Sequence, residues 1–185
     1  MNEPETIRIF LIGYRGTGKS TVARLLATAL GWEWVDADAE LEARSGRSIR
    51  SIFADEGEPS FRDREEAVLE DLCRRARIIV ATGGGVVLRE SNRRRLRGAG
   101  KVVWLTADLD TICRRLAEDS STAERRPALT GAAGACARTE VEELLRKREP
   151  FYRECADVVL DTTHRSPEDV ARELLDLFRT DEVPD

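Results

Sequence analysis

Residues 13–20 of this chain read GYRGTGKS, and this stretch decides the fold class. It matches GxxxxGK[ST], a loop whose glycines let backbone N–H groups converge on phosphate oxygens. A β-rich apolar run, IRIFLI at 7–12, precedes the loop, and apolar residues at helical spacing follow it from residue 20 to residue 30. This order places the loop at the N-terminus of a helix, whose dipole favours bound anions. We therefore expect a nucleotide-phosphate site here.

The loop and its helix supply the candidate phosphate ligands. Lys19 should reach the β- and γ-phosphates of ATP as a point charge, and the Ser20 hydroxyl should ligate Mg²⁺. The complete candidate set for ATP in this region is Gly13, Gly16, Thr17, Gly18, Lys19, Ser20 and Thr21. The apolar face of the helix is expected to consist of Val22, Leu25, Leu26 and Ala29.

The rest of the sequence excludes two other classes of phosphate-loop protein. A guanine-nucleotide switch would need the patterns NKxD and DxxG, and neither occurs in the 185 residues. A motor-type ATPase would have a long apolar strand that ends in an acid, whereas the runs at 78–81 and 102–105 are followed by threonine. The run VVLD at 158–161 has that form but comes last in the chain, and we interpret it as edge structure. A small-molecule kinase remains.

Short apolar runs alternate with helical stretches along the chain, at residues 34–35, 78–81, 102–105 and 158–160 after the first strand. Strands separated by helices need crossover connections, so we expect an α/β fold with a mostly parallel sheet and helices on both faces. The length suits a single domain, 1–185. The last helix should begin at Ser166-Pro167, with serine as the cap. Its apolar face is expected to consist of Val170, Leu174, Leu177 and Phe178.

One segment, residues 118–137, interrupts this alternation because it is polar at first and then rich in Gly and Ala. A loop of that length in a compact domain is typical of a lid or of a disordered segment. We expect a lid that is mobile when free and that closes when nucleotide and acceptor are both bound, which would exclude water from the reaction.

Three further patterns concern the acceptor, two of them within residues 36–65 and one directly after the third predicted strand. Open α/β sheets bind ligands at the carboxyl ends of their strands. Asp36 and Asp38 could serve a metal-bound water and the attacking hydroxyl, although in isolation an acidic turn that caps the next helix is the better interpretation. Arg62 and Glu65 lie one helical turn apart, which suits either an arginine oriented by a carboxylate or an ordinary surface pair. The glycines at 83–85 suit either a closely approaching ligand or a flexible turn. Only the three patterns taken together distinguish the functional interpretation from the structural one.

Taken together, these motifs resemble those of shikimate kinases. The stretches GKST at 18–21, DAD at 36–38, GEPSFRDRE at 57–65, GGG at 83–85, Arg-Pro at 126–127 and KREPFY at 147–152 occur in that family's order and approximate spacing. The resemblance extends over residues 7–178 and implies a nucleoside-monophosphate-kinase-like fold, with five parallel strands in the order 2-3-1-4-5. It also implies transfer of the γ-phosphoryl group from MgATP to the 3-hydroxyl of shikimate, in aromatic amino-acid biosynthesis.

The resemblance further implies roles for individual residues at the acceptor site. Asp38 would bind the shikimate hydroxyls and act as the base, and Asp36 would be an outer-shell magnesium ligand. Arg62 and Arg148 would clamp the shikimate carboxylate, because a planar guanidinium offers two parallel donors and lysine cannot. The backbone that would lie against the ring belongs to Gly83, Gly84 and Gly85.

Several arginines are assigned by the same resemblance on the nucleotide side. Arg126 would close over the transferring phosphate, and Arg115 and Arg165 would flank the adenine. The lid of this chain departs from the family's Arg-Pro-Leu, because Ala128 replaces the leucine and Arg125 precedes the pair. Arg15 adds a charge to the phosphate loop that many members of the family lack, and the sequence offers no account of it.

Composition limits the partners and the compartment. The net charge of −5 offers no overall basic field for nucleic acid, and no apolar segment is long enough to span a bilayer. The N-terminal residues lack the positive region of a secretory signal, so we expect a cytoplasmic protein. Its four widely spaced cysteines fit no zinc pattern and are expected to be reduced structural thiols. We expect a monomer that acts on ATP and shikimate.

Two alternatives stay open at this point. A gluconate-type kinase shares the fold and the phosphate loop but lacks the FRxxE and GGG pair. A kinase-like binding protein without catalysis would be expected to have lost the residues of the reaction, yet Lys19, Asp38, Arg62 and Arg126 are all present.

Overall fold

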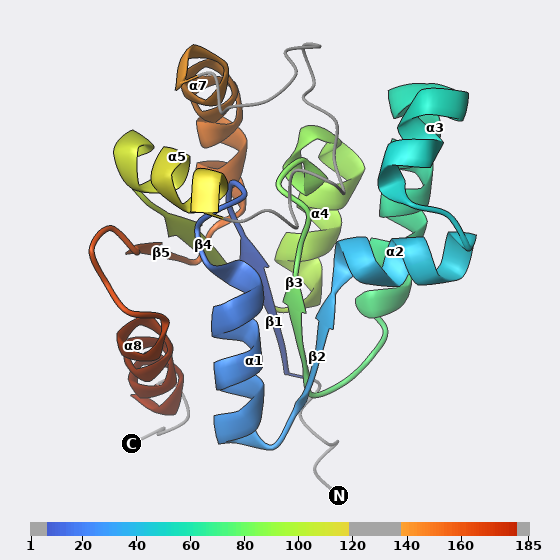
Figure 1. Cartoon of the computed structure of the whole chain (residues 1–185). Coiled ribbons are helices and arrows are strands. Elements are labelled where there is room, and N and C mark those ends of the chain that lie inside the picture. Colours follow the sequence, from blue (N-terminus) through green and yellow to red (C-terminus); the bar gives the residue numbers. More distant parts are fainter. Residues whose placement is uncertain (1–6, 119–137, 181–185) are drawn as a thin grey trace, which may run out of the picture.

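The computed structural model describes residues 7–118 and 138–180, with side chains described up to residue 178. Its centre is a parallel sheet of five strands in the order β2-β3-β1-β4-β5 (Figure 1). The strands are β1 (Arg8–Ile12), β2 (Glu33–Asp36), β3 (Ile78–Ala81), β4 (Lys101–Thr106) and β5 (Val158–Asp161). The expected α/β class and strand order are confirmed, and each predicted run agrees with its strand to within about one residue at either end.

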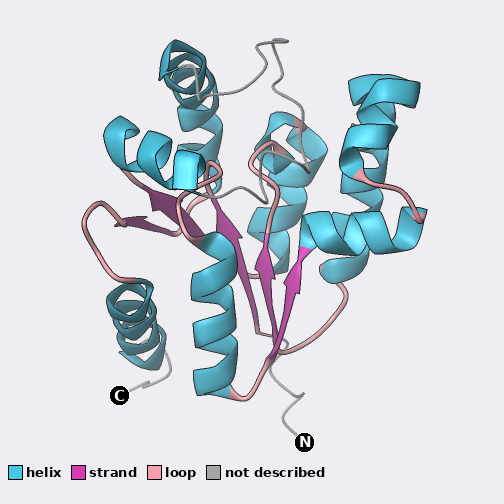
Figure 2. Cartoon of the chain, viewed as in Figure 1, coloured by secondary structure: helices cyan, strands magenta, loops and turns pink. Residues whose placement is uncertain are grey.

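Helices cover both faces of this sheet, as Figure 2 shows. They are α1 (Lys19–Leu30), α2 (Ala37–Ser45), α3 (Ile49–Leu72), the 3₁₀ turn η1 (Val86–Leu88), α4 (Glu90–Ala99), α5 (Leu109–Glu118), α7 (Arg138–Cys155) and α8 (Pro167–Thr180). Within the described part of the chain, no helix is both long enough and apolar enough to cross a membrane.

The two faces of the sheet belong to two separate apolar clusters. Phe10 and Ile12 of β1 pack in the cluster that α2, α3, α4 and α7 cover. Ile9 and Leu11, which point to the opposite face, pack in the cluster that α1 and α8 cover. Because successive strand residues point to opposite faces, a strand buried on both sides must be apolar throughout. This explains why the inner strands β1, β3 and β4, which are largely buried, were recognisable as uninterrupted apolar runs.

Two predicted helix faces were partly wrong. On α1, Ala29 is exposed, while Ala23 and Ala27 are buried. Alanine carries little apolar area, so spacing alone does not decide which alanines face the sheet. On α8, Leu177 is 39% exposed, whereas Val170, Leu174 and Phe178 pack in or against the core as predicted.

The helix α3 is bent at Gly57, where φ is 82° and ψ is 176°. This combination is open almost only to glycine. Pro59 follows and has no N–H with which to continue the helical hydrogen bonds. The bend divides α3 into two helical halves, residues 49–56 and residues 58–72.

Candidate active site

The loop between β1 and α1 has a backbone that its glycines make possible. Gly13, Gly16 and Gly18 have φ angles of 136°, 79° and 89°, in a region that residues with a side chain rarely adopt. A Cβ atom on Gly13 would also overlap the carbonyl oxygen of Leu105 in β4. The loop therefore runs close over the ends of two strands and leads directly into α1, whose first N–H groups are available to an anion.

Lys19, the first residue of α1, is held inside this loop. Its side chain is buried, and Nζ donates to the carbonyl oxygen of Tyr14 at 2.7 Å. The hydroxyl of Thr17 donates to the same oxygen, also at 2.7 Å. Because an ammonium group has three donors, Lys19 can brace the loop and still offer a proton to a phosphate oxygen.

Ser20 and Asp36 form the candidate magnesium position. The Ser20 hydroxyl donates to Oδ2 of Asp36 at 2.7 Å, which joins the start of α1 to the end of β2. The other carboxylate oxygen, Oδ1, accepts from the backbone N–H groups of Asp38 and Ala39 at 3.1 and 3.3 Å. Asp36 therefore caps α2, as the competing interpretation expected, and still presents one oxygen at the phosphate loop.

These oxygens suit Mg²⁺, which prefers hard ligands and keeps several waters. Among the described residues, no cluster of three or more His, Cys, Asp or Glu side chains could hold a metal by itself. One hydroxyl and one carboxylate match an ion that enters with the phosphates of a nucleotide. The donor set thus fits a nucleotide-borne magnesium ion.

Strand pairing brings the DxD pattern to the glycine run. Asp36 is the register partner of Ala81, the last residue of β3, so the segment that begins at Thr82 starts beside it. Asp38 lies in the first turn of α2 and is half-buried. The carbonyl of Gly83 accepts from the N–H of Val86 at 3.1 Å, which turns the chain into η1.

Arg62 projects from the second half of α3 and is buried among carboxylates. Nη1 donates to Oε2 of Glu65 at 2.7 Å, while Nε and Nη2 donate to Oε1 of Glu58 at 3.1 and 2.9 Å. Glu65 is itself buried, so this is not an ordinary surface pair. The pairing with Glu65 is the one that the helical spacing suggested, and Glu58 adds a second carboxylate that holds the guanidinium plane.

The glycine run lies between Arg62 and Arg148. A Cβ atom on Gly85 would lie 2.5 Å from Nη2 of Arg62, so no larger residue fits there without displacing the guanidinium. Nη1 of Arg148 donates to the carbonyl of Gly84 at 3.3 Å, and the hydroxyl of Tyr152 donates to the same oxygen. The run is a packed junction between two buried guanidinium groups and the phosphate loop, rather than a flexible turn.

The family model for shikimate kinase matches residues 15–179. This chain belongs to the shikimate kinase family. Enzymes of this family are kinases that use ATP to phosphorylate shikimate, and the chain is a phosphotransferase of that kind.

Individual relatives agree with the family match. A shikimate kinase of Rhodopirellula baltica is 45% identical over 174 residues, which cover 94% of this chain and 91% of the relative. The solved structure of a shikimate kinase from Acinetobacter baumannii in complex with shikimate has a TM-score of 0.88 and 34% identity, with 97% of each chain covered. A gluconokinase from Sinorhizobium meliloti, at 16% identity and a TM-score of 0.55 with 98% and 100% coverage, shares the fold alone.

The two arginines that the family resemblance assigned to adenine lie in different environments. Arg115 of α5 donates to the carbonyl of Gly16 at 3.1 Å and to the carbonyl of Thr162 at 2.8 Å. Burial lowers the pKa of this guanidinium below its usual range. Arg165 instead donates to Glu173 of α8 at 2.5 Å. The structure thus brings Arg115 to the phosphate loop and engages Arg165 with the last helix.

Some site residues had no role assigned from the sequence. Tyr14 supplies the carbonyl that Lys19 and Thr17 share, and the guanidinium carbon of Arg148 lies 5.7 Å from the centre of its ring. Glu58 is the second carboxylate on Arg62. Tyr14 stands at a variable position of the loop motif, and Glu58 was quoted only as part of GEPSFRDRE, so neither carried a signal of its own.

Two predictions concern residues outside the described part of the chain. The lid predicted at 118–137 is described only at its first residue, and both Arg125 and Arg126 lie beyond it.

Thr21, the last residue of the candidate ATP set, is exposed on the first turn of α1.

Proposed function

We propose that the protein transfers the γ-phosphoryl group of MgATP to the 3-hydroxyl of shikimate, with Arg62 and Arg148 gripping the carboxylate of the acceptor. The observation that carries the proposal is the position of these two buried guanidinium groups on either side of Gly84 and Gly85, next to the phosphate loop. Paired guanidinium groups offer the parallel donors that a planar carboxylate accepts.

The remaining roles follow from the same arrangement. Lys19 and the loop amides neutralise the β- and γ-phosphates. Ser20 and Asp36 would hold Mg²⁺, which would supply further charge neutralisation at the phosphates. Asp38, one residue beyond the cap of α2, accepts the proton of the attacking hydroxyl. Arg126 is assigned to the transferring phosphate from the sequence alone, and Arg115 and Arg165 to the adenine.

The proposal includes the protein's wider setting. Residues 1–185 form a single kinase domain that acts as a monomer in the cytoplasm and binds neither nucleic acid nor membrane. One five-stranded sheet runs through the described residues, which supports a single domain, and the net charge of −5 offers no overall basic field for nucleic acid.

A coupled assay of ADP release with shikimate or gluconate as acceptor tests the proposal. We expect turnover with shikimate only, abolished by chelation of Mg²⁺. Turnover with gluconate would favour the alternative sugar-acid kinase, and shikimate binding without turnover would favour a catalytically silent protein. Because Arg62→Lys keeps the charge but loses the paired donors, we expect calorimetry to show shikimate binding weakened by roughly 1.5 to 3 kcal/mol with ATP affinity nearly unchanged.

A further inference from the structure

The half of α3 that carries Arg62 is separated from the rest of its helix. At Gly57 the backbone leaves the helical conformation, and Pro59 cannot donate to the preceding turn. The direction of residues 58–72 therefore does not continue the helical geometry of residues 49–56. Side-chain contacts across the bend help to set the angle between the halves, and Arg62 moves with the second half.

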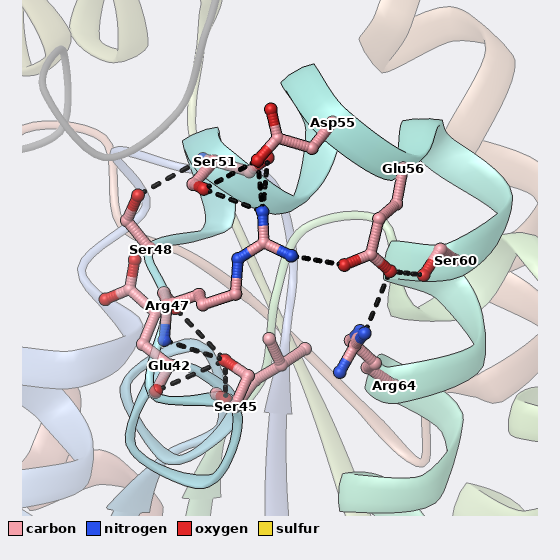
Figure 3. Close-up of polar contacts among 10 residues, drawn as sticks. Glu42, Ser45, Arg47, Ser48, Ser51, Asp55, Glu56, Ser60 and Arg64 are labelled. Carbon is pink, nitrogen blue, oxygen red and sulfur yellow. Dashed lines mark hydrogen bonds and ion pairs between the residues drawn. The ribbon is translucent and has the colours of Figure 1, made fainter.

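The side chain of Glu56 forms hydrogen bonds between the two halves. Glu56 is the last residue before Gly57, and Figure 3 shows its carboxylate directed at Ser60 and Arg64 of the second half. Its Oε2 accepts from the hydroxyl of Ser60 at 2.5 Å and from Nη2 of Arg64 at 2.8 Å. The hydrogen bond from Ser60, followed by the contact with Arg64, lowers the pKa of Glu56 to about 2, so the carboxylate stays charged throughout the neutral range.

Arg47 anchors Glu56 on the other side. It lies in the turn between α2 and α3, and its Nη1 donates to Oε1 of Glu56. Nη2 donates to the hydroxyl of Ser51 at 2.9 Å and to Asp55, both in the first half of α3 (Figure 3). One carboxylate oxygen of Glu56 therefore binds Arg47, which lies before the bend, and the other binds Ser60 and Arg64, which lie after it.

An apolar contact crosses the same bend. The rings of Phe53 and Phe61 lie 4.7 Å apart, and Phe61 precedes Arg62 directly. The guanidinium carbon of Arg62 lies 5.0 Å from the centre of the Phe61 ring. The aromatic pair brings the halves together, and Glu56 supplies the directional bonds that orient one against the other.

We infer that Glu56 is a positioning residue for Arg62, which acts on shikimate affinity by holding the two halves of α3 at a set angle through Ser60, Arg64 and Arg47. The inference rests on the proposed role of Arg62 in binding the acceptor carboxylate. Exposed ion pairs contribute little to stability as a rule, so the expected effect of Glu56 is on geometry rather than on folding.

Glu56→Gln tests this, because it keeps the shape of the side chain and removes the charge. Relative to the unaltered enzyme, we expect the shikimate Kd from calorimetry and the shikimate KM to rise about three- to tenfold, with the KM for ATP unchanged. Glu56→Asp, which restores the carboxylate on a shorter arm, should recover part of that loss.

Glu66→Gln is the matched control. Glu66 also lies in the second half of α3 and also binds two arginines, Arg89 and Arg95, but its ion pairs do not cross the bend. We expect it to leave the shikimate KM unchanged. An equal rise in KM for Glu66→Gln would overturn the inference, because any loss of charge on this helix would then suffice.

A double-mutant cycle separates this inference from the proposed function. If Glu56 acts through Arg62, Glu56→Gln should add little to the loss caused by Arg62→Lys, whereas additive effects would contradict the inference while leaving the role of Arg62 intact. If Arg62→Lys itself leaves shikimate binding unchanged, the proposed role of Arg62 fails and the inference fails with it.

Discussion

Lys19, which we propose acts on the phosphates, also has a structural contact inside its own loop. It is buried in the loop that it follows, where its ammonium group donates to the carbonyl of Tyr14. A buried charge needs partners, and here a neutral carbonyl of the same loop provides one. Phosphate oxygens are stronger hydrogen-bond partners for an ammonium group than a neutral carbonyl, which is consistent with the proposed role of Lys19 at the nucleotide.

Replacement of Lys19 should therefore affect turnover much more than folding. For Lys19→Ala we expect turnover to fall by a factor on the order of a hundred or more, since a charge on the transferring phosphates is lost. Thermal unfolding should show a folded protein, because Lys19 belongs to none of the three apolar clusters of the core. A folded variant with near-normal turnover would contradict the phosphate assignment.

Tyr14 offers a second prediction at this scale. Its ring is buried beside Arg148, and its hydroxyl has no hydrogen-bond partner among the residues that the structure describes. Tyr14→Phe keeps the ring and removes a desolvated hydroxyl, so the free energy of unfolding should stay equal or rise by up to about 1 kcal/mol. Tyr14→Leu removes the ring, so shikimate binding should weaken by about 0.5–1 kcal/mol.

Chemical denaturation and calorimetry on both variants check these expectations. Both variants keep the backbone carbonyl that Lys19 and Thr17 share, so ATP affinity serves as the internal control. A loss of stability in Tyr14→Phe above about 1 kcal/mol would mean that the hydroxyl has a partner after all.

At the scale of elements, helix ends and bends were set by a few polar residues. Ser166 begins α8 by accepting from the N–H of Asp169 at 3.1 Å, as the sequence predicted. Ser48 begins α3 in the same way, by accepting from the N–H of Ser51 at 3.1 Å. Such caps satisfy N–H groups that the helix itself cannot. Gly57, by contrast, interrupts a helix. Its backbone conformation allows the bend inside α3, and the side chain of Glu56 reaches across that bend.

The cap of α8 can be tested directly. Ser166→Ala should lower the free energy of unfolding by about 1 kcal/mol, measured by denaturant titration. Thr28→Ala is the matched control, because the Thr28 hydroxyl also makes one exposed backbone bond, to the carbonyl of Arg24 at 2.9 Å, but in the interior of α1. That change should be neutral or slightly stabilising, since alanine is the better helix former. Equal losses in both variants would argue against a specific capping role.

At the scale of the whole molecule, the face of the sheet that α3 and α7 cover, the helices that carry Arg62 and Arg148, also holds two cysteines. Cys73, after α3, and Cys155, at the end of α7, both pack against the cluster that α2, α3, α4 and α7 cover. Burial raises the pKa of each thiol to about 11. Both are free thiols, in agreement with the expectation from the sequence.

The raised pKa values predict slow thiol chemistry. At pH 8 about one in a thousand of these thiols is ionised in the folded protein, so a thiol reagent should modify Cys73 and Cys155 much more slowly than in guanidinium. An unfolded chain loses these protons near pH 9 and the folded chain near 11, so stability should fall as pH rises through that window. Mass spectrometry of labelled peptides checks the rates. Equal labelling of Cys155 in native and unfolded protein would contradict this.

The sequence by itself determined the features that depend on neighbouring residues. The phosphate loop, the five apolar runs and the capped start of α8 were predictable because each depends on a few neighbouring residues. These are the glycines of the loop, the apolar side chains of each run and the serine that caps the helix. Strand order came from the family resemblance rather than from periodicity, and the register of the sheet confirmed it.

Only the tertiary structure decided which distant groups meet. Arg62 and Glu65 were readable as a pair at helical spacing, but the position of Gly85 against Arg62 and of Arg148 on Gly84 depends on how the elements pack. The bend in α3 was also not evident from the sequence. Gly57 could have ended a helix, but the structure shows a second helical half after it, which Glu56 contacts through Ser60 and Arg64. A guanidinium has several donors and a long flexible arm, so its partner is chosen by the surrounding three-dimensional arrangement rather than by its neighbours in the chain.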